Sequence, residues 1–224
     1  MSVFLPFVTS PPHSSDLRLI DAFRPSLLSL LPPPDEPVHA EALLALCVGD
    51  GLLEVLEWSR EGTGADPAAS MWLAALRWHH VITGTFPAGA PQPPPRPTSH
   101  ALRLIVDTAG VELIPGSAHT SLSGLSSAEM GTRRAPPQPE ADDDAALLRI
   151  LPISCLPYVE TPMKQDWAET AICLTHGSSA LIREARHRAA HPPTPVPLGP
   201  RHELLEVVVE DLDRRWREVT LPKR

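Results

Sequence analysis

Proline limits what this chain can fold into more than any other residue does. The sequence holds 28 prolines, well above their usual share of roughly 5% of residues. Most of them cluster at 31–37, 86–97, 135–139 and 191–200. A proline inside a helix removes a backbone donor and clashes with the preceding turn. The clusters therefore mark connections, and the segments between them are predicted to be the regular elements.

The segments between the clusters have the apolar spacing of helices. The most sharply defined start is at Asp66 and Pro67, an N-cap residue followed by a proline at the first helical position. No segment alternates apolar and polar residues in the way of a half-buried strand. The fold class is therefore all-α, with helices predicted over 16–31, 38–60, 67–83, 98–110, 166–190 and 200–219.

Nothing in the composition divides the chain, so residues 1–224 are predicted to form a single all-α domain. Within it, residues 86–97 form a proline-rich loop. A linker is the alternative reading of this stretch, although its length also suits a loop on the surface of one bundle.

Charge and cysteine content exclude several classes of protein. The net charge of −8 disfavours binding to nucleic acid or to an anionic membrane. No apolar window is long enough to span a membrane. Cys47, Cys155 and Cys173 are an odd number of cysteines in apolar settings, which is typical of buried thiols in a reducing compartment. We expect a cytoplasmic protein that binds neither nucleic acid nor membrane.

One predicted helix contains residues that helices disfavour. The stretch "ICLTHGSSALI" at 172–182 places Thr175, His176 and Gly177 in the middle of the segment 166–190. A central glycine costs a helix about 1 kcal/mol relative to alanine. Either a ligand requires these residues there, or tertiary packing overrides their low propensity.

Catalytic and metal-binding motifs are missing from the sequence. It has no Cys-x-x-Cys, His-Glu-x-x-His or Gly-x-Ser-x-Gly pattern. Asp142, Asp143 and Asp144 could gather around a hard cation, but they also suit the start of the helix that follows them. The second interpretation is favoured, so the motifs predict no metal site and no catalytic residue.

Four segments, taken in their order and spacing, resemble proteins of the ADP-ribosylglycohydrolase family, which includes dinitrogenase-reductase-activating glycohydrolase. The resemblance covers residues 38–190. It is carried by "GLLEVLEWSREGTGADPAASMWLAALRW" at 51–78, "HTSLSGLSSAEMGT" at 119–132, "ALLRILPISCL" at 146–156 and "ICLTHGSSALI" at 172–182.

The resemblance implies an orthogonal multi-helix bundle, here incomplete at both ends, that removes ADP-ribose from modified proteins with two magnesium or manganese ions. It also implies that Thr175, His176 and Gly177 lie beside the cleft. Together with Arg149, they are the predicted ligand-binding residues, and ADP-ribose or an ADP-ribosylated protein is the predicted partner. In the alternative reading, Gly177 lets another helix approach, and Arg149 pairs with an acid such as Asp144 or Glu160.

The chain departs from the family at the metal-binding acids. His39–Ala40–Glu41–Ala42 stands in place of the first Thr-Asp-Asp-Thr motif, and 142–145 stands in place of a glycine-rich turn. Asp211 and Asp213 have acid spacing near the end of the chain but lack the family's setting. Two hard cations need several carboxylates, so no cofactor is expected in this copy.

These departures predict a catalytically inactive relative, a pseudoenzyme that binds without turning over. Two alternatives stay open. One is an active hydrolase with Glu41 and Asp142–Asp144 as replacement ligands. The other is a helical interaction module with a vestigial cleft.

Overall fold

The computed structural model describes residues 12–108, 111–192 and 199–222. Within these ranges the regular elements are helices, with two isolated bridges and no strand. This confirms the all-α prediction. In chain order the elements are α1 (Ser14–Leu28), α2 (Ala40–Arg60), α3 (Pro67–Thr83), α4 (Pro97–Thr108), α5 (His119–Gly124), the 3₁₀ helix η1 (Asp144–Ile150), α6 (Leu151–Ser154), α7 (Thr161–Cys173), α8 (Ser179–Ala190) and α9 (Glu203–Thr220).

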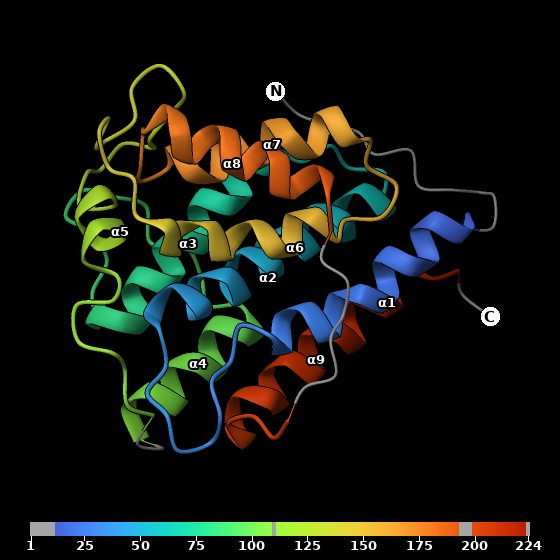
Figure 1. The fold of residues 1–224 in the computed structure, drawn as a ribbon, viewed down its shortest axis with the longest axis horizontal. Coiled ribbons are helices and arrows are strands. Elements are labelled where there is room, and N and C mark those ends of the chain that lie inside the picture. Colours follow the sequence, from blue (N-terminus) through green and yellow to red (C-terminus); the bar gives the residue numbers. More distant parts are fainter. Residues whose placement is uncertain (1–11, 109–110, 193–198, 223–224) are drawn as a thin grey trace.

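Helix α2 lies at the centre of the molecule and contacts α3, α4, α6, α9 and η1 (Figure 1). Every residue from Ala40 to Leu53 is buried. The helix is apolar almost all round, which is the pattern of a helix enclosed by others rather than of one lying on a surface. The few polar residues in this stretch, among them Glu41 and Asp50, are therefore buried and need partners.

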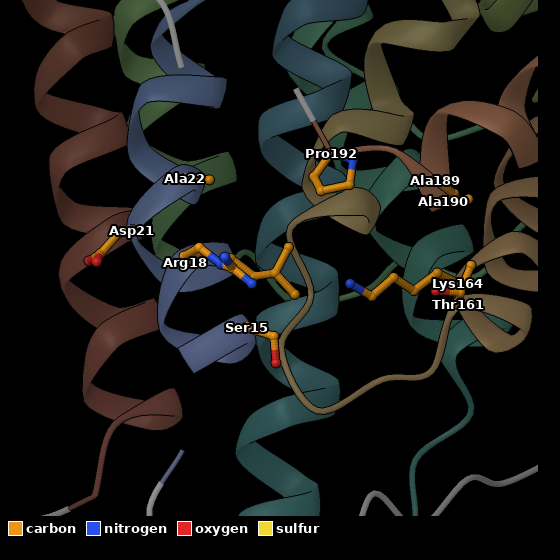
Figure 2. A pocket seen from close by; sticks show the side chains of 10 residues that line it. Ser15, Arg18, Asp21, Ala22, Thr161, Lys164, Ala189, Ala190 and Pro192 are labelled. Atoms are coloured by element: carbon orange, nitrogen blue, oxygen red, sulfur yellow. The ribbon is translucent and has the colours of Figure 1, made fainter. Parts of the chain in front are cut away.

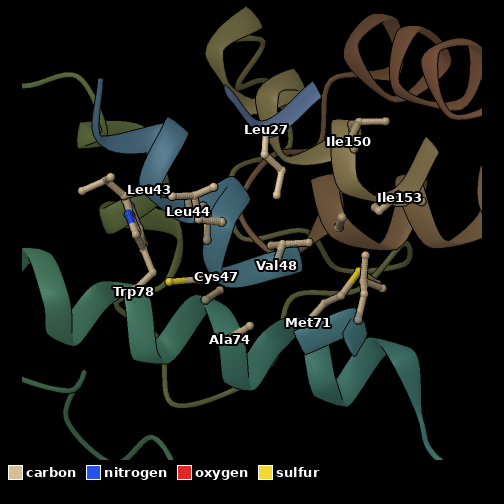
Figure 3. Packing of buried hydrophobic residues seen from close by; sticks show 14 of the residues in the cluster. Leu27, Leu43, Leu44, Cys47, Val48, Met71, Ala74, Trp78, Ile150 and Ile153 are labelled. Carbon is tan, nitrogen blue, oxygen red and sulfur yellow. The ribbon is translucent and has the colours of Figure 1, made fainter. Parts of the chain in front are cut away.

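Packing between α2 and its neighbours forms one continuous apolar core (Figure 3). Leu43, Leu44, Cys47 and Val48 of α2 face Met71, Ala74 and Trp78 of α3, with Ile150 and Ile153 on the opposite side. The indole N–H of Trp78 donates to the carbonyl of Ala40 at 2.9 Å, so the buried ring keeps its hydrogen bond. All three cysteines are buried free thiols, as their apolar settings predict. None of the helices in the described ranges is long and apolar enough to cross a membrane.

Local sequence signals place both ends of α3. The Asp66 side chain accepts a hydrogen bond from the amide of Ala68 at 3.0 Å, with Pro67 at the first position. At the other end, Gly84 adopts a left-handed conformation with φ of 79°, which glycine reaches without strain. The predicted helix over 67–83 is confirmed in full.

The first and last helices lie side by side, as Figure 1 shows. Phe23 of α1 stacks on Trp216 of α9, with ring centroids 3.9 Å apart. The spacing of the apolar residues on α9 predicts one stripe of Leu204, Val208, Leu212 and Trp216, and the last three are buried. The prediction is wrong for Leu204, which is 40% exposed, and Leu205 is the buried residue of that turn.

The predicted helix over 166–190 is wrong as a single element. Helix α7 ends at Cys173 and α8 begins at Ser179, so Thr175, His176 and Gly177 lie in a turn between two antiparallel helices (Figure 1). Thr175 and His176 bond to each other through their side chains, with Oγ1 and Nδ1 2.7 Å apart. Threonine, histidine and glycine favour such local alternatives over a helix interior. The structure therefore follows the low helix propensity of these three residues, and tertiary packing does not override it.

Candidate functional site

Arg149 is fully buried at the end of η1, at the centre of a polar cluster. Its guanidinium donates to Glu41 Oε2 at 2.7 Å and to Ser121 Oγ at 2.6 Å. It also donates to Thr175 Oγ1 at 2.8 Å and to the carbonyl of Ala171 at 3.3 Å. Its ion-pair partner is Glu41, and neither Asp144 nor Glu160 fills that role.

Glu41 joins the cluster from the first turn of α2, where the helix dipole favours a negative charge. Ser121, from α5, bridges the pair: its hydroxyl accepts from Arg149 and donates to Glu41 Oε1. Glu41 and Arg149 are 2% and 1% exposed. A buried pair of this kind needs extra hydrogen bonds to offset the cost of removing two charges from water, and Ser121 and Thr175 supply them.

His176 lies at the edge of this cluster and is 1% exposed. Because Thr175 Oγ1 accepts from Arg149, its hydroxyl proton is free to bond Nδ1 of His176. That arrangement leaves the imidazole proton on Nε2. Nε2 has no hydrogen-bond partner among the described residues, and Asp143 Oδ2 lies 3.9 Å away. Burial, together with the charge of Arg149, lowers the pKa of His176 to about 4, so the ring is neutral at pH 7.

Gly177 allows a close approach of the chain, although by a loop and not by a helix. A Cβ at this position would lie 2.6 Å from Pro136 Cγ and 2.6 Å from Pro139 Cα. Gly124 on α5 has the same role toward the turn, because a Cβ there would lie 2.7 Å from the carbonyl oxygen of Thr175. The side chain of Gln138 ties the two parts together, donating to the carbonyls of Thr120 and Thr175.

The structure thus brings three of the four predicted site residues, Arg149, Thr175 and His176, into one hydrogen-bonded group. Gly177 follows them and packs against Pro136 and Pro139. Ser121 is the member that sequence reasoning missed. The signal available was its place in "HTSLSG", inside a segment already singled out for its resemblance, but serine in a polar stretch indicates no particular role.

The described residues do not fit a two-metal centre. They contain no group of three or more His, Cys, Asp or Glu side chains that could hold an ion. Glu41 is engaged by Arg149 and Ser121. Asp142, Asp143 and Asp144 are exposed, and Asp143 accepts from the hydroxyl of Thr120. Hard divalent cations need several converging oxygen ligands, which these acids do not provide.

The cluster is also closed to solvent. Four cavities lie elsewhere on the described surface, and none is lined by Arg149, Thr175, His176 or Gly177. One of them, of about 630 Å³, lies between α1, α7 and the end of α8. The residues predicted to bind a ligand therefore bind one another in this structure.

The lowered pKa of His176 predicts a specific loss of stability in acid. The unfolded chain takes up this proton near pH 6.5 and the folded chain only near pH 4, so stability falls as pH drops through that window. At pH 5 the linkage amounts to about 2 kcal/mol. We expect His176→Gln to remove a decrease of that size, measured as the difference in urea unfolding between pH 7 and pH 5.

The exposed His119 provides the matched control for this measurement. A His119→Gln variant should keep the wild-type difference between pH 7 and pH 5. An unchanged difference in His176→Gln would show that His176 titrates normally and is not held neutral by the cluster.

No family model matches the chain, and neither a curated protein nor a solved structure matches it.

Proposed function

We propose that this protein is an ADP-ribosylglycohydrolase-like pseudoenzyme, an all-α binding protein that does not hydrolyse ADP-ribosyl bonds. The observation that carries the proposal is the buried pairing of Glu41 with Arg149 at 2.7 Å. Glu41 is the acid expected at the position of the first metal motif, and here its charge is already neutralised by a guanidinium.

A cation and Arg149 would compete for the same carboxylate. Glu41 Oε2 accepts from Arg149 and Oε1 accepts from Ser121. To bind a metal ion, Glu41 would have to leave both donors, and Arg149 would then be buried without a counter-charge. Leaving a buried charge unpaired costs several kcal/mol. The packing thus favours a cluster with a structural role over one that positions a metal ion.

Hydrolysis also requires a group that activates water. His176 is a titratable side chain at the edge of the cluster. It is neutral, its Nδ1 is bonded to Thr175, and its ring is buried. The exposed acids at 142–144 do not converge with another carboxylate in the described part of the molecule.

A second candidate is binding of ADP-ribose without turnover. It is favoured by the Nε2 of His176, a buried donor with no partner among the described residues, which faces Asp143. A displaced 142–144 segment would expose this donor to a ribose hydroxyl or phosphate oxygen. Calorimetric titration with ADP-ribose distinguishes this candidate, because binding that is lost in His176→Phe and kept in His119→Phe would support it.

The proposal predicts no enzymatic release of ADP-ribose. Purified protein is incubated with an arginine-ADP-ribosylated substrate, with and without manganese, and release should equal that of a blank without protein. In the same preparation, manganese should leave the melting temperature unchanged, because a ligand raises it only by binding the folded state. Manganese-dependent release above the blank would contradict the proposal and favour an active hydrolase with replacement ligands.

A further inference from the structure

The cavity of about 630 Å³ is formed by α1, α7 and α8, and none of the residues that line it belongs to the Arg149 cluster (Figure 2). Helix α1 forms one wall, the start of α7 forms the opposite wall, and the end of α8 closes the third side. The volume lies within the range of about 300–1,000 Å³ that is typical of small-molecule sites.

Most of the cavity wall is apolar. The side chains that share this property are Leu19, Ala22, Ala189, Ala190 and Pro192. Small and aliphatic residues of this kind offer no hydrogen bonds, so they favour a saturated chain over a sugar or a nucleotide.

Two cationic side chains reach into the apolar space from opposite walls, as Figure 2 shows. Lys164 of α7 is only 5% exposed, and its ammonium group has three donors. One of them bonds to the carbonyl of Ser154 at 3.2 Å. Arg18 of α1 is exposed, and its guanidinium makes no hydrogen bond or ion pair with any residue that the structure describes.

The acids nearby are engaged elsewhere. Asp21 at the cavity rim pairs with Arg217 of α9 at 3.0 Å. Asp16 accepts from the amides of His13 and Tyr158 at 3.2 and 3.0 Å. The cavity therefore combines an apolar wall with two cationic side chains, Arg18 and Lys164, that have no carboxylate partner among the described residues. Burial of a charge without a counter-charge is costly.

We propose that this cavity binds an aliphatic carboxylate, with its head between Arg18 and Lys164 and its chain against the apolar wall. The Arg18 fork can hold both carboxylate oxygens, and Lys164 adds a second, shielded charge. This site is separate from the cluster at Arg149, so the inference does not depend on the proposed function.

The protonation of Lys164 provides a second test of the same site. Burial lowers the pKa of Lys164 to about 8, although the neighbouring Cys155 and Asp16 act in the opposite direction. Arg18 and Asp21 are the other charged groups that line the cavity. A carboxylate bound beside the amine favours the ammonium form, so binding at pH 8.5 should take up protons. Calorimetry in two buffers with different ionisation enthalpies measures that uptake.

The experiment is a calorimetric titration of the full chain with sodium decanoate. Two further probes separate the parts of the ligand: acetate has the head without the chain, and decyltrimethylammonium has the chain with the opposite charge. We expect decanoate to bind at least about tenfold more tightly than either probe. Arg18→Gln and Lys164→Met should each weaken decanoate about tenfold or more, the usual consequence of losing a hydrogen bond to a charged group.

Arg183→Gln is the matched control, because Arg183 is an exposed arginine of α8 that does not line the cavity. It should bind decanoate as the wild type does. Arg18 is on the surface, so Arg18→Gln keeps the test valid if Lys164→Met alters the fold. Absent decanoate binding, equal binding of both ten-carbon probes, or undiminished binding by Arg18→Gln would each overturn the proposal.

Discussion

Arg149→Met is expected to lower the free energy of unfolding by about 3–5 kcal/mol, because it leaves Glu41 buried without its counter-charge. Glu41 is 2% exposed, and its remaining donor would be the hydroxyl of Ser121. Methionine fills a similar volume, so most of the loss arises from charge and not from a cavity. Urea unfolding at pH 7, followed by circular dichroism, measures it.

The double variant Glu41→Gln/Arg149→Met provides the control for charge. It should recover a large part of the loss, since removing both members of a buried pair is far less costly than removing one. Arg214→Met provides the control for position. Arg214 pairs with Asp211 and Glu218 on the exposed side of α9, and such surface pairs contribute about 0–1 kcal/mol. A double variant no more stable than Arg149→Met would show that the cluster is not held by the ion pair.

Lys164→Met is expected to act in the opposite direction and raise the free energy of unfolding by about 2–3 kcal/mol at pH 7. The pKa of Lys164 is lowered from 10.5 to about 8 by burial, and each unit is worth about 1.4 kcal/mol. Loss of the hydrogen bond to the Ser154 carbonyl offsets about 1 kcal/mol of that gain.

The pH dependence of the Lys164→Met effect distinguishes burial of charge from packing. Between pH 8 and 10.5 the unfolded chain binds this proton and the folded chain does not, so wild-type stability rises with pH through that window. The gain from Lys164→Met should therefore shrink over the same range. Arg183→Met, at an exposed site, should show no such trend. A gain that stayed constant from pH 7 to pH 10 would refute the explanation.

Each of the two variants tests a buried cation, and the two cations differ in their surroundings. Arg149 has a carboxylate, two hydroxyls and a carbonyl. Lys164 has one carbonyl and a cavity. A charge retained at a cost to stability is expected where binding requires it. Of the two cations, Lys164 is the one with room for a further partner, because it lines a cavity.

Much of the helical framework followed from local signals in the sequence. The proline clusters separate the elements, and the cap at Asp66 with Pro67 places the start of α3. Apolar spacing located α2 and α9, because a repeat near 3.6 residues is a property of the segment itself, but it did not predict that Trp58 and Leu204 are exposed. Helix propensity, another local property, also indicates the break at 174–178, because threonine, histidine and glycine are poor helix formers.

The candidate site depended on the tertiary structure. Residue types alone indicated that Arg149 needs a partner, but the acids considered were its neighbours in sequence, Asp144 and Glu160. The actual partner, Glu41, is 108 positions away. The cavity beside Lys164 likewise exists only because α1 and α7 flank a common space. Periodicity and caps act within a few residues, whereas charge pairing and cavities depend on how distant helices pack, so only the folded molecule could decide them.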